Sequence, residues 1–218
     1  MIHVKFCGLR REEDIEAVNR LRPDFAGFVF AKSKRQITAE AAAGLKKQLA
    51  PEIQTVAVLV NMPAEEAAAL VNTGIADLLQ LHGDEDAAYI AALRKLTKAK
   101  LIKAIRLQGN EDDRIRLKQA EQTDFYLFDT FVANTYGGTG KTFSLSLLKG
   151  VPIDKPFFLA GGLDADNVAG IIGQIQRDEK LCPFFYGVDV SGGIETEGYK
   201  DPIKMEMFMK AILGKEKT

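Results

Sequence analysis

Two side chains that can move protons stand at the ends of short apolar runs far apart in the chain. Cys7 ends HVKFC and precedes Gly8, and Asp129 ends FYLFD. A thiolate can act as a base or nucleophile, and a carboxyl group can act as a general acid when burial raises its pKa. In an extended strand Lys5 shares a face with Cys7, and a nearby cation favours the thiolate. Cys7 and Asp129 are therefore our candidates for catalytic residues.

Each candidate also has an interpretation without chemistry. A lone cysteine in an apolar strand is usually a small buried side chain. Cys182 lacks the setting of Cys7, and we interpret it as structural. An aspartate after a strand often caps the next turn. His82, which ends LLQLH, could be a base, a phosphate-binding group, a ring that stacks on an aromatic ligand, or a structural residue. The position of each residue in the fold must decide among these interpretations.

The elements that would position these residues repeat along the whole chain. Eight apolar runs rich in Val, Ile and Phe begin near residues 3, 25, 54, 77, 100, 125, 156 and 184. Between and after them, apolar residues recur every three or four positions, as in amphipathic helices, over 12–21, 39–49, 64–74, 86–96, 113–121, 145–150, 165–176 and 202–213. Strands that alternate with helices predict a parallel sheet covered by helices.

Eight such units predict that the α/β fold is a single-domain (β/α)₈ TIM barrel with eight parallel strands. The chain has 218 residues, near the short end for such barrels, so we expect one domain over 1–218. An open doubly wound sheet is the alternative. It usually has fewer strands and a G-x-G-x-x-G turn after the first, whereas CGLRRE follows the first run here.

In a barrel of this class the active site forms at the carboxyl ends of the strands. The polar or glycine residues at these ends are Cys7, Ser33, Arg35, Asn61, His82, Asp129, Gly161, Gly162 and the segment 189–193. LAGGLDADNV and VDVSGGIETEGYKD, after the seventh and eighth strands, are rich in glycine. The loops in these two places often bind phosphate, so we predict a phosphorylated substrate, although tight turns alone could also explain the glycines.

TYGGTGKT at 135–142 is a near match to the phosphate-binding loop of ATPases. That motif requires a glycine at position 135, where this chain has Thr135. The segment also follows the sixth strand, and the stretch after it is too short for the long helix that the motif precedes. We therefore predict a rim loop beside Asp129 and no nucleotide site.

The composition limits the partners. The chain has 29 Lys and Arg against 30 Asp and Glu, two Cys and two His. No global charge excess favours nucleic acid or an anionic membrane, no apolar run is long enough to span a bilayer, and no Cys or His spacing resembles a metal site. With no leader segment before HVKFCG, we expect a cytoplasmic protein with a small phosphorylated substrate. We expect no nucleic acid, membrane or metal, and a monomer with a homodimer as the alternative.

Taken in order, the motifs cover almost the whole chain: KFCGL, GFVFAKSKR, VLVN, LLQLHG, FDT followed by GGTGKTF, LAGGLDADNV and GVDVSGGIETEGYKD. Together they resemble the phosphoribosylanthranilate isomerases. The resemblance implies a cofactor-free Amadori rearrangement of N-(5-phosphoribosyl)anthranilate to 1-(2-carboxyphenylamino)-1-deoxyribulose 5-phosphate in tryptophan biosynthesis. The alternatives are another phosphate-binding barrel enzyme, such as a sugar-phosphate isomerase, an epimerase or a lyase, and a non-catalytic ligand-binding barrel.

The resemblance also implies a role for each site residue. Cys7 would be the general base and Asp129 the general acid. Arg35 would face the anthranilate carboxylate, Asp189 would orient a sugar hydroxyl, and His82 would line the aromatic end of the pocket. The phosphate contacts would come from Gly161, Gly162, Ser191 and Gly192, and Gly138 would contact the substrate from the rim loop.

The chain departs from the family pattern in three places. Ser33-Lys34-Arg35 stands where the family often has SPR, and Ser144-Leu145 where it often has Asp or Trp. The third is Ser191-Gly192-Gly193, where the family often has SSG. The glycine at 192 lacks a hydroxyl but keeps its backbone N–H group, so we predict at most weaker phosphate binding, and the same reaction.

Overall fold

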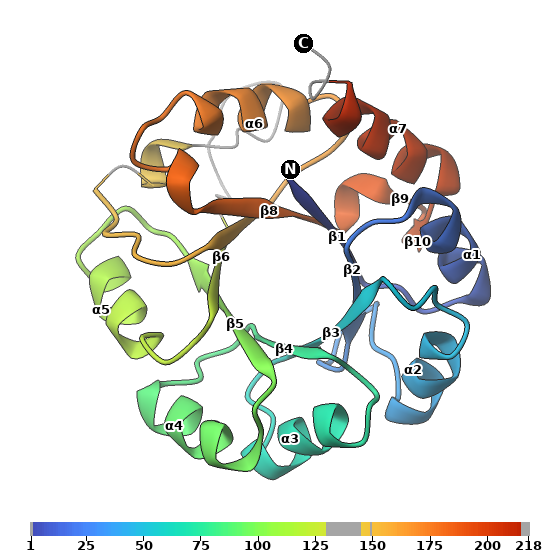
Figure 1. Ribbon diagram of the computed structural model, residues 1–218, viewed down its shortest axis with the longest axis horizontal. Helices are drawn as coiled ribbons and strands as arrows, with labels where there is room; N and C mark the ends of the chain where they lie inside the picture. Colours follow the sequence, from blue (N-terminus) through green and yellow to red (C-terminus); the bar gives the residue numbers. More distant parts are fainter. Residues whose placement is uncertain (1, 130–144, 149, 215–218) are drawn as a thin grey trace.

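The computed structural model describes residues 2–129, 145–148 and 150–214, and eight parallel strands close into a barrel within them. Each strand pairs with its neighbours in chain order, and β1 pairs with β8 to complete the ring (Figure 1). The strands are β1 (His3–Cys7), β2 (Phe25–Val29), β3 (Gln54–Leu59), β4 (Leu78–Leu81), β5 (Lys100–Arg106), β6 (Phe125–Asp129), β7 (Phe157–Ala160) and β8 (Phe185–Val190). The predicted barrel is confirmed.

Helices form the outer ring. They are α1 (Glu12–Leu21), α2 (Ala39–Lys46), α3 (Ala64–Asn72), α4 (Ala87–Leu96), α5 (Asp112–Gln119), α6 (Val168–Gln176) and α7 (Pro202–Leu213). Several begin at a side-chain cap, as sequence rules predict: the Asp86 carboxylate accepts from Tyr89 N, and Asp201 accepts from Ile203 N with Pro202 in the first turn. Within the described residues no helix is both long and apolar enough to cross a bilayer.

One predicted helix is wrong. The segment 145–150, between β6 and β7, contains the short 3₁₀ helix η1 (Leu145–Leu148) in place of a turn of α-helix. Gly150 follows with a φ of 88°, and Pro152 comes two residues later. A left-handed glycine and a proline both stop a helix, so no helix continues from η1 past Gly150.

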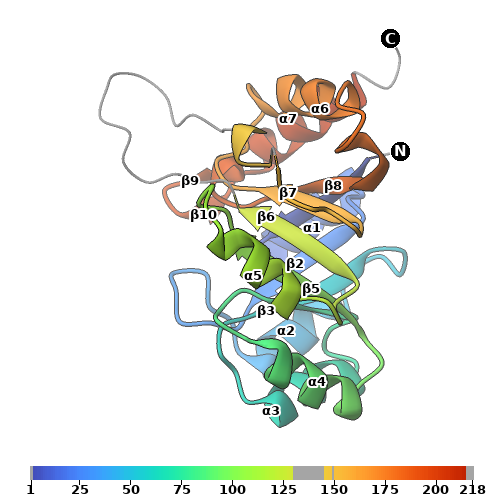
Figure 2. The same ribbon diagram turned by 90° about the vertical axis from the view of Figure 1, so that its left-hand side faces the viewer.

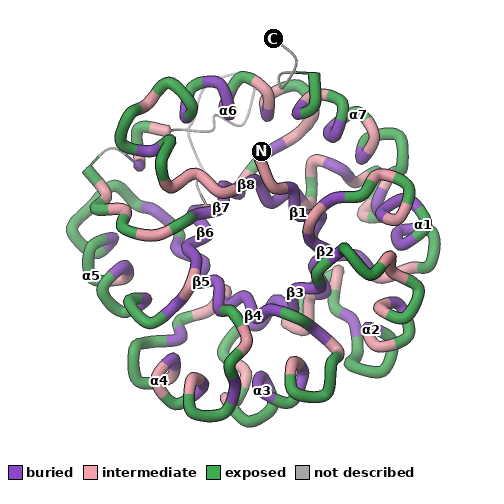
Figure 3. The backbone as a smooth tube through the Cα atoms, in the orientation of Figure 1, coloured by how far each residue is buried: buried purple, intermediate pink, exposed green. Residues whose placement is uncertain are grey.

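The strands bury both of their faces. Side chains that point outward, such as Phe6, Phe28, Leu79 and Leu159, pack with the helices. The inward side chains of the lower barrel form a separate apolar cluster that includes Phe25, Val56, Leu78, Ile102, Phe125, Leu127 and Phe158. Figure 3 shows the resulting pattern, a buried inner wall and exposed outer helix surfaces.

Polar side chains replace this apolar filling towards the carboxyl ends of the strands. Lys5, Gln80 and Asp189 point inward above it, and each is 7% exposed or less. After β8 the chain forms the 3₁₀ helix η3 (Gly192–Ile194) and a two-stranded ribbon of β9 (Glu195–Thr196) and β10 (Tyr199–Lys200). Figure 2 shows this ribbon at the end of the barrel to which the arrowhead of β6 points. The fold therefore gathers its buried charges at one end.

Candidate active site

A cavity of about 860 Å³ opens at the carboxyl ends of the strands. Among the residues that line it are all the described residues to which we assigned a role: Cys7, Arg35, His82, Asp129, Gly161, Gly162, Asp189, Ser191 and Gly192. Asn61, also a strand-end candidate, does not line it, and its Oδ1 accepts from Asp84 N at 2.8 Å. Gly138 and the rest of TYGGTGKT lie outside the described residues. The barrel thus brings residues from six strands and their loops to one site, as strand-end placement predicts.

Cys7 lies beside a buried ion pair. The Lys5 ammonium lies between the two oxygens of Asp189, 3.0 Å from each, and Lys5 is fully buried. Gly27 on β2 leaves room for this arrangement, because a Cβ atom there would lie 3.1 Å from Cys7 Sγ and 3.2 Å from Lys5 Nζ. Glycine at this position therefore allows thiol and ammonium to approach each other.

Burial raises the pKa of the Cys7 thiol, and the Lys5 ammonium opposes that rise. Lys5 acts in the expected direction, but burial outweighs it, and the Asp189 carboxylate also disfavours a second negative charge. The Lys5–Asp189 pair is nearly neutral as a unit. The Lys5 ammonium thus lies next to the sulfur, but in the enzyme without substrate Cys7 favours the thiol over the thiolate.

Arg35 crosses from the loop after β2 to the ribbon after β8. Its Nε and Nη2 atoms donate to the two carboxylate oxygens of Glu195, at 2.5 and 2.8 Å. The stem of Arg35 passes over Gly8, where a Cβ atom would lie 2.5 Å from Arg35 Cδ. Gly8 has a φ of 84°, so a side chain there would be strained as well as crowded.

Glu195 also accepts from Lys200 Nζ at 2.8 Å, and its side chain is 6% exposed. Burial alone would raise the pKa of this carboxyl group, but the hydrogen bonds from Arg35 and Lys200 lower it to about 2. Glu195 is therefore ionised at any pH at which the protein works.

The Ser191 hydroxyl is committed within the protein. It donates to the Cys7 carbonyl oxygen at 2.9 Å and lies 3.2 Å from Lys200 Nζ. A hydroxyl has one proton to donate, so in this arrangement a phosphate contact from Ser191 would have to come from its backbone N–H group. Ser191 thereby ties the loop after β8 to the end of β1.

The opposite wall holds His82 and Asp129, with His82 Nε2 3.9 Å from Asp129 Oδ2. Gln80 Nε2 lies 2.9 Å from His82 Nδ1. With the amide nitrogen facing the ring, Nδ1 accepts and the ring proton of neutral His82 is on Nε2, facing Asp129. Burial lowers the pKa of His82, and the Asp129 carboxylate opposes this shift.

The two glycine-rich loops meet at the third part of the cavity. Gly161 and Gly162 have φ values of 95° and 67°, in the left-handed region that glycine favours. A Cβ atom on Gly193 would clash with the carbonyl oxygen of Leu163, so glycine is required where the loops after β7 and β8 touch. The loops therefore form one continuous backbone surface.

Sequence reasoning missed four residues of this site. Arg106 ends β5 and lines the cavity, as the rule of polar residues at strand ends would have indicated. Gln80 precedes His82 by two positions and shares its face, which strand periodicity could have indicated. Glu195 and Lys200 pair with each other, but nothing local places this pair at the site, because their other partners are Arg35 on the loop after β2 and Ser191 after β8.

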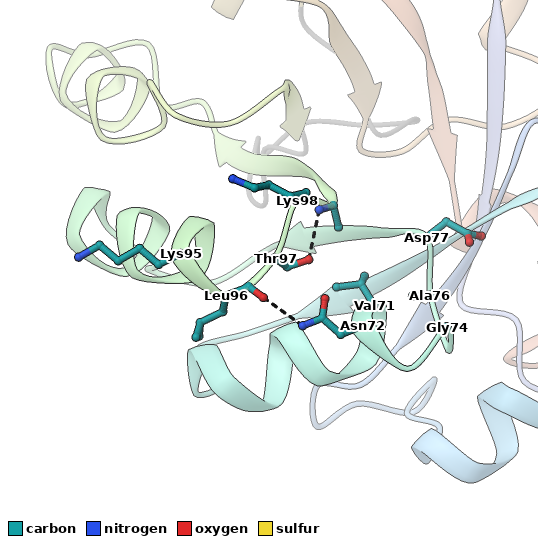
Figure 4. A pocket seen from close by; sticks show the side chains of 10 residues that line it. Val71, Asn72, Gly74, Ala76, Asp77, Lys95, Leu96, Thr97 and Lys98 are labelled. Carbon is teal, nitrogen blue, oxygen red and sulfur yellow. Dashed lines mark hydrogen bonds between the residues drawn. The ribbon is translucent and has the colours of Figure 1, made fainter.

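A second hollow lies at the other end of the barrel, where the carboxyl ends of α3 and α4 meet (Figure 4). Asn72 Nδ2 donates there to the Leu96 carbonyl oxygen at 3.0 Å, and Lys95 and Lys98 lie at its edge. None of the predicted site residues lines it. In the described part of the chain, no three His, Cys, Asp or Glu side chains are grouped so that they could hold a metal ion.

Comparison with known proteins identifies the family. A family model described as N-(5'-phosphoribosyl)anthranilate (PRA) isomerase matches residues 4–211. The enzyme of that name from Thermoanaerobacter pseudethanolicus is 47% identical over 216 residues, which are 98% of this chain and 99% of the relative.

Solved structures agree with this assignment. The crystal structure of phosphoribosyl anthranilate isomerase from Thermotoga maritima is 34% identical with a TM-score of 0.81, over 98% of this chain and 100% of that one. A second, 31% identical with a TM-score of 0.78 over the same shares, is a complex with reduced 1-(o-carboxyphenylamino)-1-deoxyribulose 5-phosphate. The chain belongs to the N-(5'-phosphoribosyl)anthranilate isomerase family.

Proposed function

We propose that Cys7 is the general base and Asp129 the general acid of this protein. As a member of its family, the protein is an isomerase of tryptophan biosynthesis, and it converts N-(5-phosphoribosyl)anthranilate to 1-(2-carboxyphenylamino)-1-deoxyribulose 5-phosphate. The observation that carries the proposal is that Cys7 and Asp129 line one cavity from β1 and β6, on opposite sides of the barrel. A substrate between them can receive a proton on one side and lose one on the other.

The reaction needs both groups in sequence. Asp129 in its acid form protonates the ribose ring oxygen, so the ring opens to a Schiff base of the anthranilate nitrogen. The Cys7 thiolate then removes the proton from C2′, and the resulting enolamine tautomerises to the ketose. The buried Lys5 ammonium stabilises the thiolate when it forms, which supports Cys7 as the base.

We assign the binding of the substrate's two anionic ends to different groups of residues. The Arg35 guanidinium is planar and suits the anthranilate carboxylate, and the joined loops with Gly161, Gly162 and Gly192 suit the phosphate. His82, which lies beside Asp129, would contact the sugar or the aromatic ring. Asp189, with both oxygens on Lys5, would reach a sugar hydroxyl only while keeping that ion pair.

The direct test is turnover of N-(5-phosphoribosyl)anthranilate by the wild type and two variants. We expect Cys7→Ser and Asp129→Asn each to lower kcat at least ~10²-fold, the low end for general acid–base catalysis, with KM nearly unchanged. Cys182→Ser is the matched control, because this thiol is exposed and outside the cavity. Near-normal turnover in either variant would remove that residue from its role. Failure of the folded wild type to complement an auxotroph lacking this isomerase would contradict the activity itself.

A further inference from the structure

We propose that Glu195 is a positioning residue that fixes how Arg35 presents its guanidinium group to the acidic end of the substrate. The inference rests on the proposed role of Arg35 as the carboxylate-binding residue. It gives a function to the second half of VDVSGGIETEGYKD, which the phosphate-loop interpretation leaves unexplained.

The hydrogen bonds of Arg35 leave one side of its guanidinium available. The group is planar and has five N–H donors, and Glu195 takes one from Nε and one from Nη2. Nη1 makes no hydrogen bond to any described residue. With the Nε–Nη2 edge on Glu195, the edge formed by Nη1 and Nη2 faces away from it. That edge offers the paired donors that a second carboxylate needs.

The Arg35 side chain lies between two glycines, and Gly8 leaves the room that its stem needs. Its stem lies across Gly8, and a Cβ atom on Gly192 would be 3.6 Å from Arg35 Nη2. Arg35 and Gly192 both line the cavity, and Arg35 Nη2 belongs to the free edge, so this edge lies at the cavity. The guanidinium group is therefore fixed by the hydrogen bonds of its Nε–Nη2 edge to Glu195 and packs on the backbone beneath it.

Glu195 is itself fixed to the catalytic end of the barrel. Lys200, 4% exposed, donates both to Glu195 and to the Ser191 carbonyl oxygen, at 2.8 and 3.0 Å. Ser191 in turn donates to the Cys7 carbonyl oxygen. A chain of hydrogen bonds thus runs from the backbone of the proposed base to Arg35, and it sets the distance between base and carboxylate-binding group.

The charges around Glu195 allow one substitution to distinguish between two roles of this residue. Lys34, Arg35 and Lys200 all lie within 3.4 Å of the Glu195 carboxylate. Three cations and one anion leave two positive charges, and removing the anion would leave three. If Glu195 only competed with the substrate for Arg35, its removal would strengthen binding of an acidic ligand. If it positions Arg35, its removal weakens binding despite the extra positive charge.

The experiment measures the affinity of Glu195→Gln for two probes by calorimetry. One is reduced 1-(o-carboxyphenylamino)-1-deoxyribulose 5-phosphate, and the other is the same compound without the carboxyl group. We expect affinity for the carboxylated probe to fall about tenfold, within the ~10²-fold that a misplaced contact can cost, while affinity for the other changes less than about twofold. Glu197→Gln, an exposed glutamate of the same ribbon, should match the wild type with both probes.

Arg35→Ala separates the inference from the role on which it rests. If Arg35→Ala weakens both probes equally, Arg35 does not bind the carboxylate and the assignment under the proposed function fails. If it weakens only the carboxylated probe, yet Glu195→Gln binds that probe as well as the wild type or better, the inference alone is overturned.

Two further variants cover the remaining outcomes. In an Arg35→Ala background, Glu195→Gln should add less than about a twofold effect, because a residue that acts through another has no effect without it. Should Glu195→Gln not fold, Glu195→Asp keeps the charge but moves the carboxylate back by one methylene. The same selective loss is expected for it, and unchanged affinity would contradict the proposal.

Discussion

The two walls of the active-site cavity hold their polar groups in different ways. On the wall with Cys7, the side chains of Lys5, Asp189, Lys200 and Glu195 are 7% exposed or less. They form two ion pairs, Lys5–Asp189 with N–O distances of 3.0 Å and Lys200–Glu195 with one of 2.8 Å. On the other wall His82 and Asp129 are 23% and 22% exposed and 3.9 Å apart. The first wall consists of buried ion pairs, and the second is a more exposed arrangement around His82 and Asp129. Changes to the first should therefore cost stability as well as activity, and changes to the second should cost activity alone.

Lys5→Met should have the largest effect. It leaves the Asp189 carboxylate buried without its cation, which typically costs about 3–5 kcal/mol of unfolding free energy. It also removes the cation that opposes the burial-induced rise in the Cys7 pKa. Since the thiolate is the active form of the base, the rising limb of kcat/KM against pH should move to higher pH. Urea unfolding and a pH–rate profile measure the two effects.

A double variant, Lys5→Met with Asp189→Asn, checks this explanation. It removes both charges, so part of the lost stability should return. The pH limb should move back only part of the way, because Asp189 raises the Cys7 pKa by less than Lys5 lowers it. Lys98→Met, an exposed lysine far from the cavity, is the control. An unchanged unfolding free energy in Lys5→Met would mean that the Lys5–Asp189 ion pair does not make this wall more important for stability than the other.

Gln80→Leu should have an intermediate effect that is confined to activity. The hydrogen bond to His82 Nδ1 holds the ring with Nε2 towards Asp129. Its loss should lower kcat roughly 2- to 10-fold, as expected for one hydrogen bond of about 0.5–1.5 kcal/mol. Unfolding free energy should not fall, because Gln80 Oε1 is already buried without a partner among the described residues.

The pKa of His82 provides a second measurement on the same variant. Burial holds it below its ordinary value, and a donor on Nδ1 further disfavours protonation at that atom. In Gln80→Leu the imidazole should therefore titrate at higher pH, as followed by NMR. A variant that loses stability and not activity would reverse the contrast between the two walls.

Gly192→Ser should have the smallest effect, and a favourable one. A Cβ atom at 192 meets nothing closer than Arg35 Nη2 at 3.6 Å, so the serine fits. Its hydroxyl adds one donor at the proposed phosphate loop and should tighten inhibition by inorganic phosphate roughly 2- to 5-fold. Gly170→Ser, a helical glycine with open space around it, is the control. Unchanged or weaker inhibition would show that the loop at 192 does not contact phosphate.

The fold could be predicted from the sequence because each barrel unit is a local pattern. Apolar runs, helical periodicity and caps such as Asp86 and Asp201 all act within about ten residues. The placement of Cys7, His82 and Asp129 followed from the same patterns, because strand ends share one rim. The predicted helix over 145–150 was wrong for a local reason too, because Gly150 and Pro152 follow Leu148 and stop a helix.

The partners of these residues could not be predicted. Lys5 meets Asp189 across 184 positions and Arg35 meets Glu195 across 160. Nothing near Asp189 or Arg35 in the sequence indicates that each is already paired. Such contacts depend on the way the closed barrel brings the loop after β8 back over β1 and β2, and only the three-dimensional arrangement reveals them.

The pairing of β1 with β8 has a consequence for biosynthesis of the protein. Cys7 ends β1 and leaves the ribosome long before Asp189, Ser191 and Lys200, which lie in β8 or after it. Until β8 docks, Lys5 has no counter-ion and the Cys7 thiol has no finished surroundings. A nascent or truncated chain that ends before β8 therefore exposes an ordinary cysteine, and enzymatic activity reports that synthesis has reached the last strand and that the ring has closed.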